Sequence, residues 1–472
     1  MGGNTLILNV LKEKIKSIIF SSIEENFLVI SLLALFLGVF TTAYLPSVGE
    51  AVSNSVEALV GAYGYFVPFL IYFLLTPALI KLIALAKKHG NGWLVSVLRQ
   101  FVVARFLAIL FAIIILTLIF RLPFHLNHGT TFMMALSQAA AQLMNAILYS
   151  SMLYGVYAAI VTMLLSFKIK WVARVADKVG DSVEYLGKFL IILSPFLMFA
   201  VGSFFYHLPV YLETNFAQNF SGGSAGMDNI IQTLRSNFIG FSLIQPKLVF
   251  VALYLLIGLM TGLLCLVWHG LYIAYARLVE PGFSLRYYLK KYWIKVYPLL
   301  WSSSSETLAV PVSLNLMKTN FPNIPSEIRQ FVITGGSYLG INGTLISVYV
   351  MAVFLAHAVG VDISFLQLLL SLPVVFILGY AVPGIPGELI IFAGTMTVLL
   401  GVPDSAAPLF MALYLTLQIG LPDSFRTGCN STDSALVAII STHNLEKMKA
   451  KAQADVLYQA TDVPQSHDEK NT

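Results

Sequence analysis

Long apolar stretches separated by short polar segments dominate the first 280 residues. Each stretch comes close to the roughly 20 residues that a helix needs to cross the hydrocarbon core of a bilayer. The pattern predicts six transmembrane helices, over Phe27–Leu45, Ala58–Ala86, Phe101–Phe120, Ala146–Phe167, Leu186–Tyr206 and Leu248–Ala276. We expect an irregular connection over Arg121–Gln142 and a long polar loop over His207–Pro246.

Lysine and arginine are distributed unevenly among the connections. The basic segments are the N-terminus and residues 87–99, 168–178 and 277–295, whereas 46–57 and 207–246 have few basic residues. Basic connections stay on the cytoplasmic side of a membrane. We therefore predict that an amphipathic N-terminal segment (1–26) and a C-terminal tail (444–472) are both cytoplasmic.

After residue 280 the apolar segments are interrupted by polar residues. Tyr297–Pro325 contains four serines, Ser302–Ser305, and Phe331–Val359 is broken by a polar turn at 340–344. Phe365–Val402 is interrupted by a Pro/Gly-rich break at 382–387, and a helix over 416–440 follows. Two copies of an interrupted segment followed by a helix indicate inverted repeats, and broken helices of this kind form the midplane sites of secondary transporters.

The helix predicted over 416–440 has one polar face. At about 100° per residue, a single face contains Asp423, Arg426, Thr427, Asn430, Asp433 and Ser434. Ionisable residues inside a membrane are rare and usually functional. The pattern favours a site filled by water or ligand, and the alternative is an Asp–Arg pair that only joins two helices.

Composition supports a polytopic, all-α membrane protein. Of the 472 residues, 58% are hydrophobic and 11% are charged, and the mean hydropathy is +0.81. A soluble protein of this length cannot bury so much apolar surface. The net charge of +5 is modest, and no basic block indicates nucleic acid binding.

No other chemistry emerges from the motifs. The two cysteines, Cys265 and Cys429, lie in apolar sequence, so we expect no disulfide. No metal-ligand spacing, cofactor motif or cleavable signal peptide is evident. The sequence has no G-x-S-x-G elbow, and we expect the protein not to be an enzyme.

From about residue 297 to 440 the chain resembles the dicarboxylate/amino acid:cation symporters, the glutamate-transporter family. Four elements with matching order and spacing carry the resemblance: the serine-rich first hairpin with Thr307 and Pro311, the Asn342-Gly343-Thr344 turn, the Val382-Pro383-Gly384 tip, and the eighth span with Asp423, Arg426, Thr427 and Asn430. The first 280 residues match mainly in layout.

The resemblance implies eight transmembrane helices with two re-entrant hairpins, in a homotrimer surrounded by membrane lipid. It also implies an elevator mechanism, in which a transport domain slides against an outer scaffold. Residues 27–280 would contain spans one to six, with spans one, two, four and five as the scaffold. Spans three and six would move with the transport-domain core, residues 281–443.

The resemblance also assigns roles to individual residues. Arg426 would bind a substrate side-chain carboxylate as a planar fork, and Asp423 would accept the α-ammonium. Asn430, Thr427 and Thr344 would bind the α-carboxylate or close the site. The hairpin tips would contribute backbone groups at Ser303, Ser304, Ser305, Val382 and Gly384, and the second hairpin would be the outer gate.

These roles imply a symporter in the inner, cytoplasmic membrane that imports small anionic solutes. Because Asp423 precedes Arg426 by three residues, we expect acidic amino acids such as aspartate or glutamate. A C4-dicarboxylate, a neutral amino acid or cystine is the alternative within the family. An uncoupled anion channel is the alternative in another class, although the polar residues are concentrated in the last third of the chain.

The coupling ion is where the chain departs from the family. Sodium-coupled members have Asn-x-Asp-Gly-Thr in the seventh span, and here Gly340 and Asn342 replace the asparagine and the aspartate. In the eighth span Asp433 stands one residue early in the Asn430–Ser434 frame. We predict fewer coupled sodium ions, with proton coupling or partial uncoupling instead and Asp433 or Glu388 as the titrating group. A sodium site made of backbone carbonyls near the second hairpin and the Asn342 turn could survive.

Overall fold

The computed structural model describes residues 26–461, except 125–131, 150, 221–222, 239, 383 and 385. The described part of the chain is helical and contains no strand. The predicted N-terminal segment and the end of the C-terminal tail lie outside the described residues.

The first half contains α2 (Phe27–Tyr44), α3 (Pro46–His89), α4 (Asn91–Phe120), α5 (Phe132–Tyr149), α6 (Ser151–Ser166), α7 (Lys170–Asn219) and α8 (Gly223–Asn237).

Shorter helices are more common in the second half. After the one-turn helices η1 (Phe241–Leu243) and η2 (Pro246–Leu248) it contains α9 (Val249–Val279), α10 (Leu285–Tyr288), η3 (Leu289–Trp293), α11 (Ile294–Ser303), α12 (Glu306–Asn320), α13 (Ser326–Leu339), α14 (Asn342–Ala358), α15 (Phe365–Leu378), η4 (Gly379–Ala381), α16 (Ile390–Leu399), α17 (Ala407–Leu417) and α18 (Leu421–Thr461).

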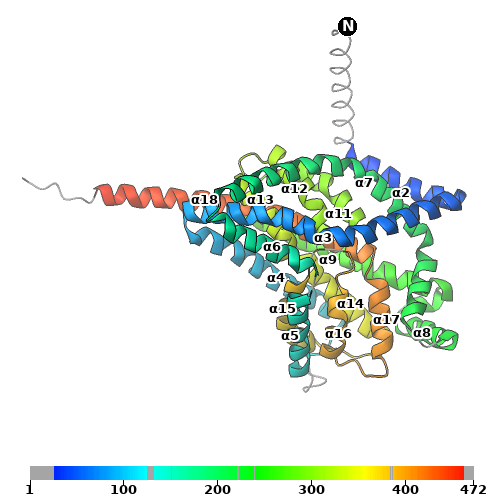
Figure 1. Ribbon diagram of the computed structural model, residues 1–472. Helices are drawn as coiled ribbons and strands as arrows, with labels where there is room; N and C mark the ends of the chain where they lie inside the picture. Colours follow the sequence, from blue (N-terminus) through cyan, green and yellow to red (C-terminus); the bar gives the residue numbers. More distant parts are fainter. Residues whose placement is uncertain are drawn as a thin grey trace, which may run out of the picture.

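The long helices α2, α3 and α7 pack together on one side of the molecule (Figure 1). The contact between α2 and α7 depends on two glycines. A Cβ atom at Gly202 would lie 2.0 Å from the carbonyl oxygen of Leu35, and one at Gly38 would lie 2.0 Å from that of Phe199. Small residues allow helix backbones to approach this closely in a membrane.

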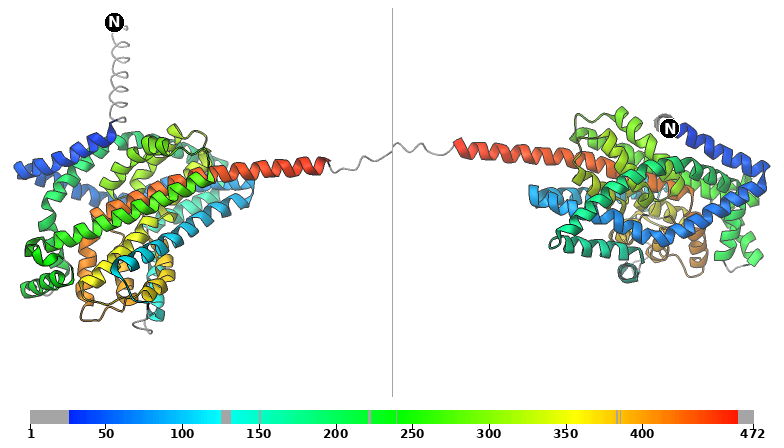
Figure 2. Two further views of the ribbon diagram at one scale, coloured as in Figure 1. Left: turned by 180° about the vertical axis from the view of Figure 1, so that it is seen from behind. Right: turned by 45° about the horizontal axis from the view of Figure 1, so that its top comes forward.

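Helix α18 forms the centre of the second half. It contacts α9, α13, α14, α11 and α12, and residues 421–442 are buried apart from the half-buried Phe425. Beyond this segment the same helix projects from the body of the protein as the red helix in Figures 1 and 2. The polar face of α18 is therefore enclosed by protein.

The predicted breaks are present in the structure. Helices α11 and α12 are separated at Ser304, which has a left-handed backbone (φ 47°). Residues 340–341 separate α13 from α14, and residues 382–389 separate η4 from α16. Each break exposes backbone groups that the helices would otherwise use internally, so a break of this kind must be buried or line a cavity.

Two predicted connections are more regular than we expected. Much of Arg121–Gln142 is not irregular, because α5 begins at Phe132 and bends by 62° into α6. The region His207–Pro246 is not a long loop, because α7 continues to Asn219 and α8 follows. The sequence of α8 is polar but amphipathic, and this pattern is compatible with a helix packed along one face.

The polar helix predicted over 416–440 begins later than expected. Residues up to Leu417 belong to α17, and α18 starts at Leu421, after Gly420 with φ +80°. The helix also extends through much of the predicted cytoplasmic tail, to Thr461. The six polar positions from Asp423 to Ser434 all lie within α18.

Six helical segments in the described part are long and apolar enough to cross a membrane, or seven if α5 and α6 form one bent span. Helix α18 is not among them because of its polar face. The composition and these segments establish a multi-pass membrane protein, and the predicted number of eight spans stays a prediction.

We predict that Gly202→Leu lowers the thermal unfolding temperature of the purified protein, because a side chain there would force α2 away from α7. Overpacking of this kind costs about 1–3 kcal/mol. Gly270→Leu on α9 is the matched control, since a Cβ there meets nothing within 4 Å. Equal unfolding temperatures for the two variants would contradict the proposed close packing.

Candidate functional site

Three breaks and the first turns of α18 meet around Arg426, whose side chain has no exposed surface. Glu388 comes from the break between η4 and α16, at the tip of the second hairpin (α15–α16). Thr344 comes from the first turn of α14, and Asp423 from α18 itself. Glu306, at the start of α12, also acts electrostatically on the guanidinium. Segments up to 120 residues apart in the sequence thus converge on one cation.

Arg426 is balanced by two carboxylates. Its Nε donates to Asp423 Oδ1 at 2.6 Å, and its Nη2 forms an ion pair with the same carboxylate. Its Nη1 forms an ion pair with Glu388 Oε1 and donates to Thr344 Oγ1 at 2.9 Å. A buried guanidinium is stable only when acceptors of this kind replace water.

The tip of the second hairpin is closed onto this ion pair. The amide of Gly384 donates to Glu388 Oε2 at 2.6 Å, and the hydroxyl of Thr344 donates to Glu388 Oε1 at 3.1 Å. The amide of Gly387 donates to Asp423 Oδ2 at 2.9 Å. Both carboxylates that hold Arg426 therefore also hold backbone groups of the hairpin tip.

Gly384 has a backbone that only glycine adopts readily. Its φ is +72°, and a Cβ atom there would lie 2.8 Å from the carbonyl oxygen of Ser337. This glycine lets the tip come close to the end of α13. Pro383 lies outside the described residues.

Asn430 joins the break between α13 and α14 to the first hairpin. Its Oδ1 accepts from the amides of Gly343 (2.6 Å) and Thr344 (3.2 Å). Its Nδ2 donates to Glu306 Oε1 at 2.7 Å and to Thr344 Oγ1 at 2.8 Å. All four hydrogen-bonding positions of this amide are used, so its orientation is fixed.

Three buried carboxylates therefore surround a single guanidinium: those of Glu306, Glu388 and Asp423. Glu306 accepts from a neutral amide through Oε1, and its Oε2 has no hydrogen-bond partner within the described residues. With all three carboxylates ionised, the cluster would carry a net charge of −2. Such a cluster favours the uptake of a cationic group or a proton.

The serine-rich break lies beside the start of α18. The hydroxyl of Ser304 is 3.1 Å from that of Ser424, and the hydroxyl of Ser305 caps α12 by accepting from the amide of Leu308. Within the described residues, Ser303 forms local hydrogen bonds with Ser305. The break thus approaches the site through Ser304.

Two other predicted site residues, Thr427 and Val382, are also buried. The hydroxyl of Thr427 is buried without a hydrogen-bond partner in the described part of the chain. Val382 is buried at the tip, two residues before Gly384. The structure groups Asp423, Asn430, Thr344 and Gly384 with Arg426.

Asp433 belongs to a second polar cluster on the same helix. Its Oδ1 lies 2.7 Å from His269 Nδ1, and its Oδ2 accepts from Trp268 Nε1 (2.9 Å) and Asn342 Nδ2 (2.8 Å). The hydroxyl of Tyr288 lies 3.4 Å from His269 Nε2. Both oxygens of Asp433 therefore already have protein partners.

Gly340 and Ser434 contact each other beside this second cluster. A Cβ atom at Gly340 would lie 2.9 Å from Ser434 Oγ, which donates to the carbonyl of Asn430 at 3.1 Å. The predicted ion-binding residues are thus close in space. The side-chain oxygens of Asn430, Asp433 and Ser434 are engaged by the protein, whereas Asn342 Oδ1 is buried without a hydrogen-bond partner in the described part of the chain.

A buried cation lies under the second hairpin. Arg105 on α4 has no exposed surface, and none of its nitrogens forms a hydrogen bond within the described residues. Its guanidinium carbon is 3.9 Å from the centroid of the Tyr380 ring. A Cβ atom at Gly379 would lie 2.6 Å from Nη2, so the positive charge is next to the backbone of the hairpin.

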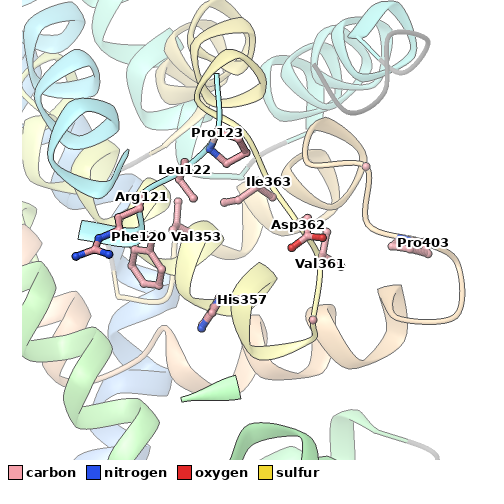
Figure 3. A pocket seen from close by; sticks show the side chains of 12 residues that line it. Phe120, Arg121, Leu122, Pro123, Val353, His357, Val361, Asp362, Ile363 and Pro403 are labelled. Carbon is pink, nitrogen blue, oxygen red and sulfur yellow. The ribbon is translucent and has the colours of Figure 1, made fainter. Parts of the chain in front are cut away.

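The cavity in Figure 3, of about 710 Å³, lies elsewhere. It is lined by residues at the end of α4 and the end of α14, including Arg121, His357 and Asp362. None of the carboxylates around Arg426 lines it. The polar cluster at Arg426, and not this cavity, is the candidate site.

Comparison with known families identifies a match over the second half of the chain. Residues 231–444 match the family model described as the sodium:dicarboxylate symporter family. Over these residues, the chain matches that family. The resemblance to the glutamate transporters is thereby confirmed, and the family is one of ion-coupled transporters and not of enzymes.

Sequence reasoning did not identify several residues of the two clusters. Glu388 was predicted only as a possible titrating group, and Glu306 was visible as an acid in apolar sequence, but nothing in the pattern showed that they point toward Arg426. His269 and Trp268 lie on a distant helix, and nothing in the pattern linked them to Asp433. Arg105 was inside a predicted span, where any charge signals a special environment.

We predict that His269→Leu lowers the free energy of unfolding by about 1–3 kcal/mol, because it removes a partner from a buried carboxylate. Asp433→Asn should lower the free energy of unfolding much less in the His269→Leu variant than in the wild type. Thermal unfolding of the four proteins in detergent forms a double-mutant cycle. Additive effects would mean that the two side chains are not coupled.

Proposed function

We propose that this protein is a secondary active symporter that imports acidic amino acids such as aspartate or glutamate. The observation that carries the proposal is the fully buried Arg426, which lies where both hairpins, the α13–α14 break and α18 converge. A planar guanidinium in a dry site is suited to a carboxylate of the substrate.

The neighbouring groups support the individual roles. Arg426 binds the side-chain carboxylate of the substrate, and Asp423, on the adjacent turn, accepts the α-ammonium. Thr344, Asn430 and Thr427 bind the α-carboxylate or close the site. The tips contribute backbone groups at 303–305, at Val382 and at Gly384, as helix ends at breaks do for anionic substrates.

One observation favours a second candidate, a neutral amino acid or cystine. Glu388 already balances the charge of Arg426, so a substrate without net charge would leave the balance of the cluster undisturbed. A C4-dicarboxylate is less favoured, because it has no ammonium group for Asp423.

The movement we propose is that of an elevator within a homotrimer in the cytoplasmic membrane, with both termini cytoplasmic. The chain would cross the membrane eight times, with α11–α12 and α15–α16 as re-entrant hairpins and the latter as the outer gate. Residues 281–443 form the core of the moving domain. Helix α7 contacts α11, α12 and α17, and such a surface is where the core would slide against the scaffold.

We further propose that sodium coupling is reduced and that protons take its place, at least in part. Sodium prefers several oxygen ligands and, in a dry site, a countercharge. Asn342 is neutral, and both oxygens of Asp433 accept from protein donors. Arg105 places a fixed positive charge beside Gly379 of the second hairpin, which disfavours a sodium site made of backbone carbonyls there.

Arg426→Cys should abolish uptake of aspartate and glutamate into proteoliposomes, because the guanidinium that holds the substrate carboxylate is removed. Uptake of neutral amino acids should persist or increase. Lys451→Cys on the exposed end of α18 is the control for the chemistry of the new thiol. Unchanged aspartate uptake by Arg426→Cys would refute the assignment, and saturable succinate uptake without competition by amino acids would favour a dicarboxylate carrier.

Aspartate uptake into proteoliposomes should be driven by an inward proton gradient and depend weakly on sodium. The measurement compares a sodium gradient, a proton gradient and no gradient at equal membrane potential. Strict sodium dependence with a steep, multi-ion Hill slope would contradict the proposed coupling. If aspartate never accumulates inside the proteoliposomes above its passive equilibrium concentration, the protein is a channel.

A further inference from the structure

We propose that Glu388 is a tethered competitor of the substrate. It holds Arg426 while the site is empty, an acidic substrate displaces it, and it takes up one proton as it leaves. This inference rests on the proposed function, because it requires Arg426 to bind a carboxylate of the substrate.

The contacts of Glu388 are those expected of a bound substrate carboxylate. Its carboxylate forms an ion pair with Arg426 and accepts hydrogen bonds from the hydroxyl of Thr344 (3.1 Å) and the amide of Gly384 (2.6 Å). The residue is 3% exposed. The side chain of Glu388 therefore occupies the positions that an incoming carboxylate would need.

An acidic substrate cannot bind next to an intact Glu388–Arg426 ion pair without upsetting the charge balance of the site. The charged groups that face Glu388 are Arg426 and Asp423 from α18 and Glu306 from α12. A further carboxylate would raise the excess of negative charge in a buried site, at a cost of several kcal/mol. The net charge of the site stays the same if the substrate carboxylate takes the place of the Glu388 carboxylate and Glu388 becomes a neutral, protonated acid.

The position of Glu388 in the hairpin makes this exchange feasible. It follows a stretch without regular helix, in which Gly384 and Gly387 both have positive φ (72° and 75°). The same stretch is closed onto the site through the amide of Gly387, which donates to Asp423. It is also closed through Glu388 itself, which pairs with Arg426 and accepts from Thr344. Release of the Glu388 carboxylate and opening of the tip therefore break shared hydrogen bonds.

The proposal makes Glu388 a specificity-determining residue. An acidic amino acid must displace it and bring in a proton, whereas a neutral amino acid can bind with the Glu388–Arg426 pair intact. Acidic substrates should consequently bind more weakly as the pH rises. One proton bound with each substrate corresponds to a change in affinity of up to about tenfold per pH unit.

The test is calorimetric titration of the purified full-length protein with L-aspartate at pH 6 and pH 8, in buffers of different ionisation enthalpy. The wild type should take up about one proton per aspartate and bind more weakly at pH 8. Glu388→Gln should bind aspartate at least about tenfold more tightly at pH 8, because a tethered competitor acts at millimolar or higher effective concentration. Its affinity should hardly change with pH, and its proton uptake should be lost.

Asp404→Asn is the control, since it removes an exposed carboxylate that is not part of the cluster around Arg426. It should keep the proton uptake and the pH dependence of the wild type. Equal affinity and equal pH dependence for Glu388→Gln and the wild type would overturn the inference, as would loss of aspartate binding by a folded Glu388→Gln protein. Glu388→Ala provides a second variant if Glu388→Gln unfolds.

The titration also separates this inference from the proposed function. If aspartate does not bind the wild type or any Glu388 variant, the proposed function fails. If aspartate binds and Arg426→Cys abolishes binding while Glu388→Gln behaves as the wild type, only the role of Glu388 is wrong.

Discussion

A guanidinium that is fully shielded from water must be surrounded by acceptors, and this requirement shapes the second half of the molecule. Arg426 obtains them from α18, from the first turn of α14 and from the second hairpin. A continuous helix has no free backbone groups to offer at its middle. The breaks at Ser304, at 340–341 and at 382–389 supply such groups and let side chains approach from several directions. The fold of this half is therefore best understood as a means of enclosing one charge.

The charges of the buried residues also determine which coupling ion the site favours. Members of this family couple transport to an ion, yet here the buried acids are already engaged. Asp433 accepts from Trp268 and Asn342 and lies next to His269, and Arg105 brings a cation of its own to the second hairpin. The carboxylates around Arg426 instead exceed the positive charge available to them. Protons can neutralise such an excess without a coordination shell, and this is why we favour them over sodium.

The sequence predicted the breaks and the polar face well, because both have local signals. Four serines, a Pro/Gly cluster and an interrupted apolar run mark positions where a helix stops. The spacing of Asp423, Arg426, Asn430 and Asp433 marks one face of α18. The resemblance to the family then placed these elements in one site. Helix α8 was less predictable, because a polar amphipathic segment resembles a loop when only hydropathy is considered.

The sequence did not predict which side chains from distant segments contact each other. The direction of the Glu388 side chain depends on the backbone of the tip, and two partners of Asp433, Trp268 and His269, lie on α9, more than 160 residues away. The start of α18 depends on Gly420, which ends α17 through a positive φ instead of continuing the polar helix. In each case the residue was visible but its neighbours were not.

The most direct test of the account is a structure determined by cryo-electron microscopy with and without L-aspartate. Without substrate, we expect the carboxylate of Glu388 on Arg426. With L-aspartate, we expect the side-chain carboxylate of the substrate on Arg426, its ammonium near Asp423, and Glu388 displaced. A complex in which aspartate binds elsewhere while Glu388 stays on Arg426 would contradict the account.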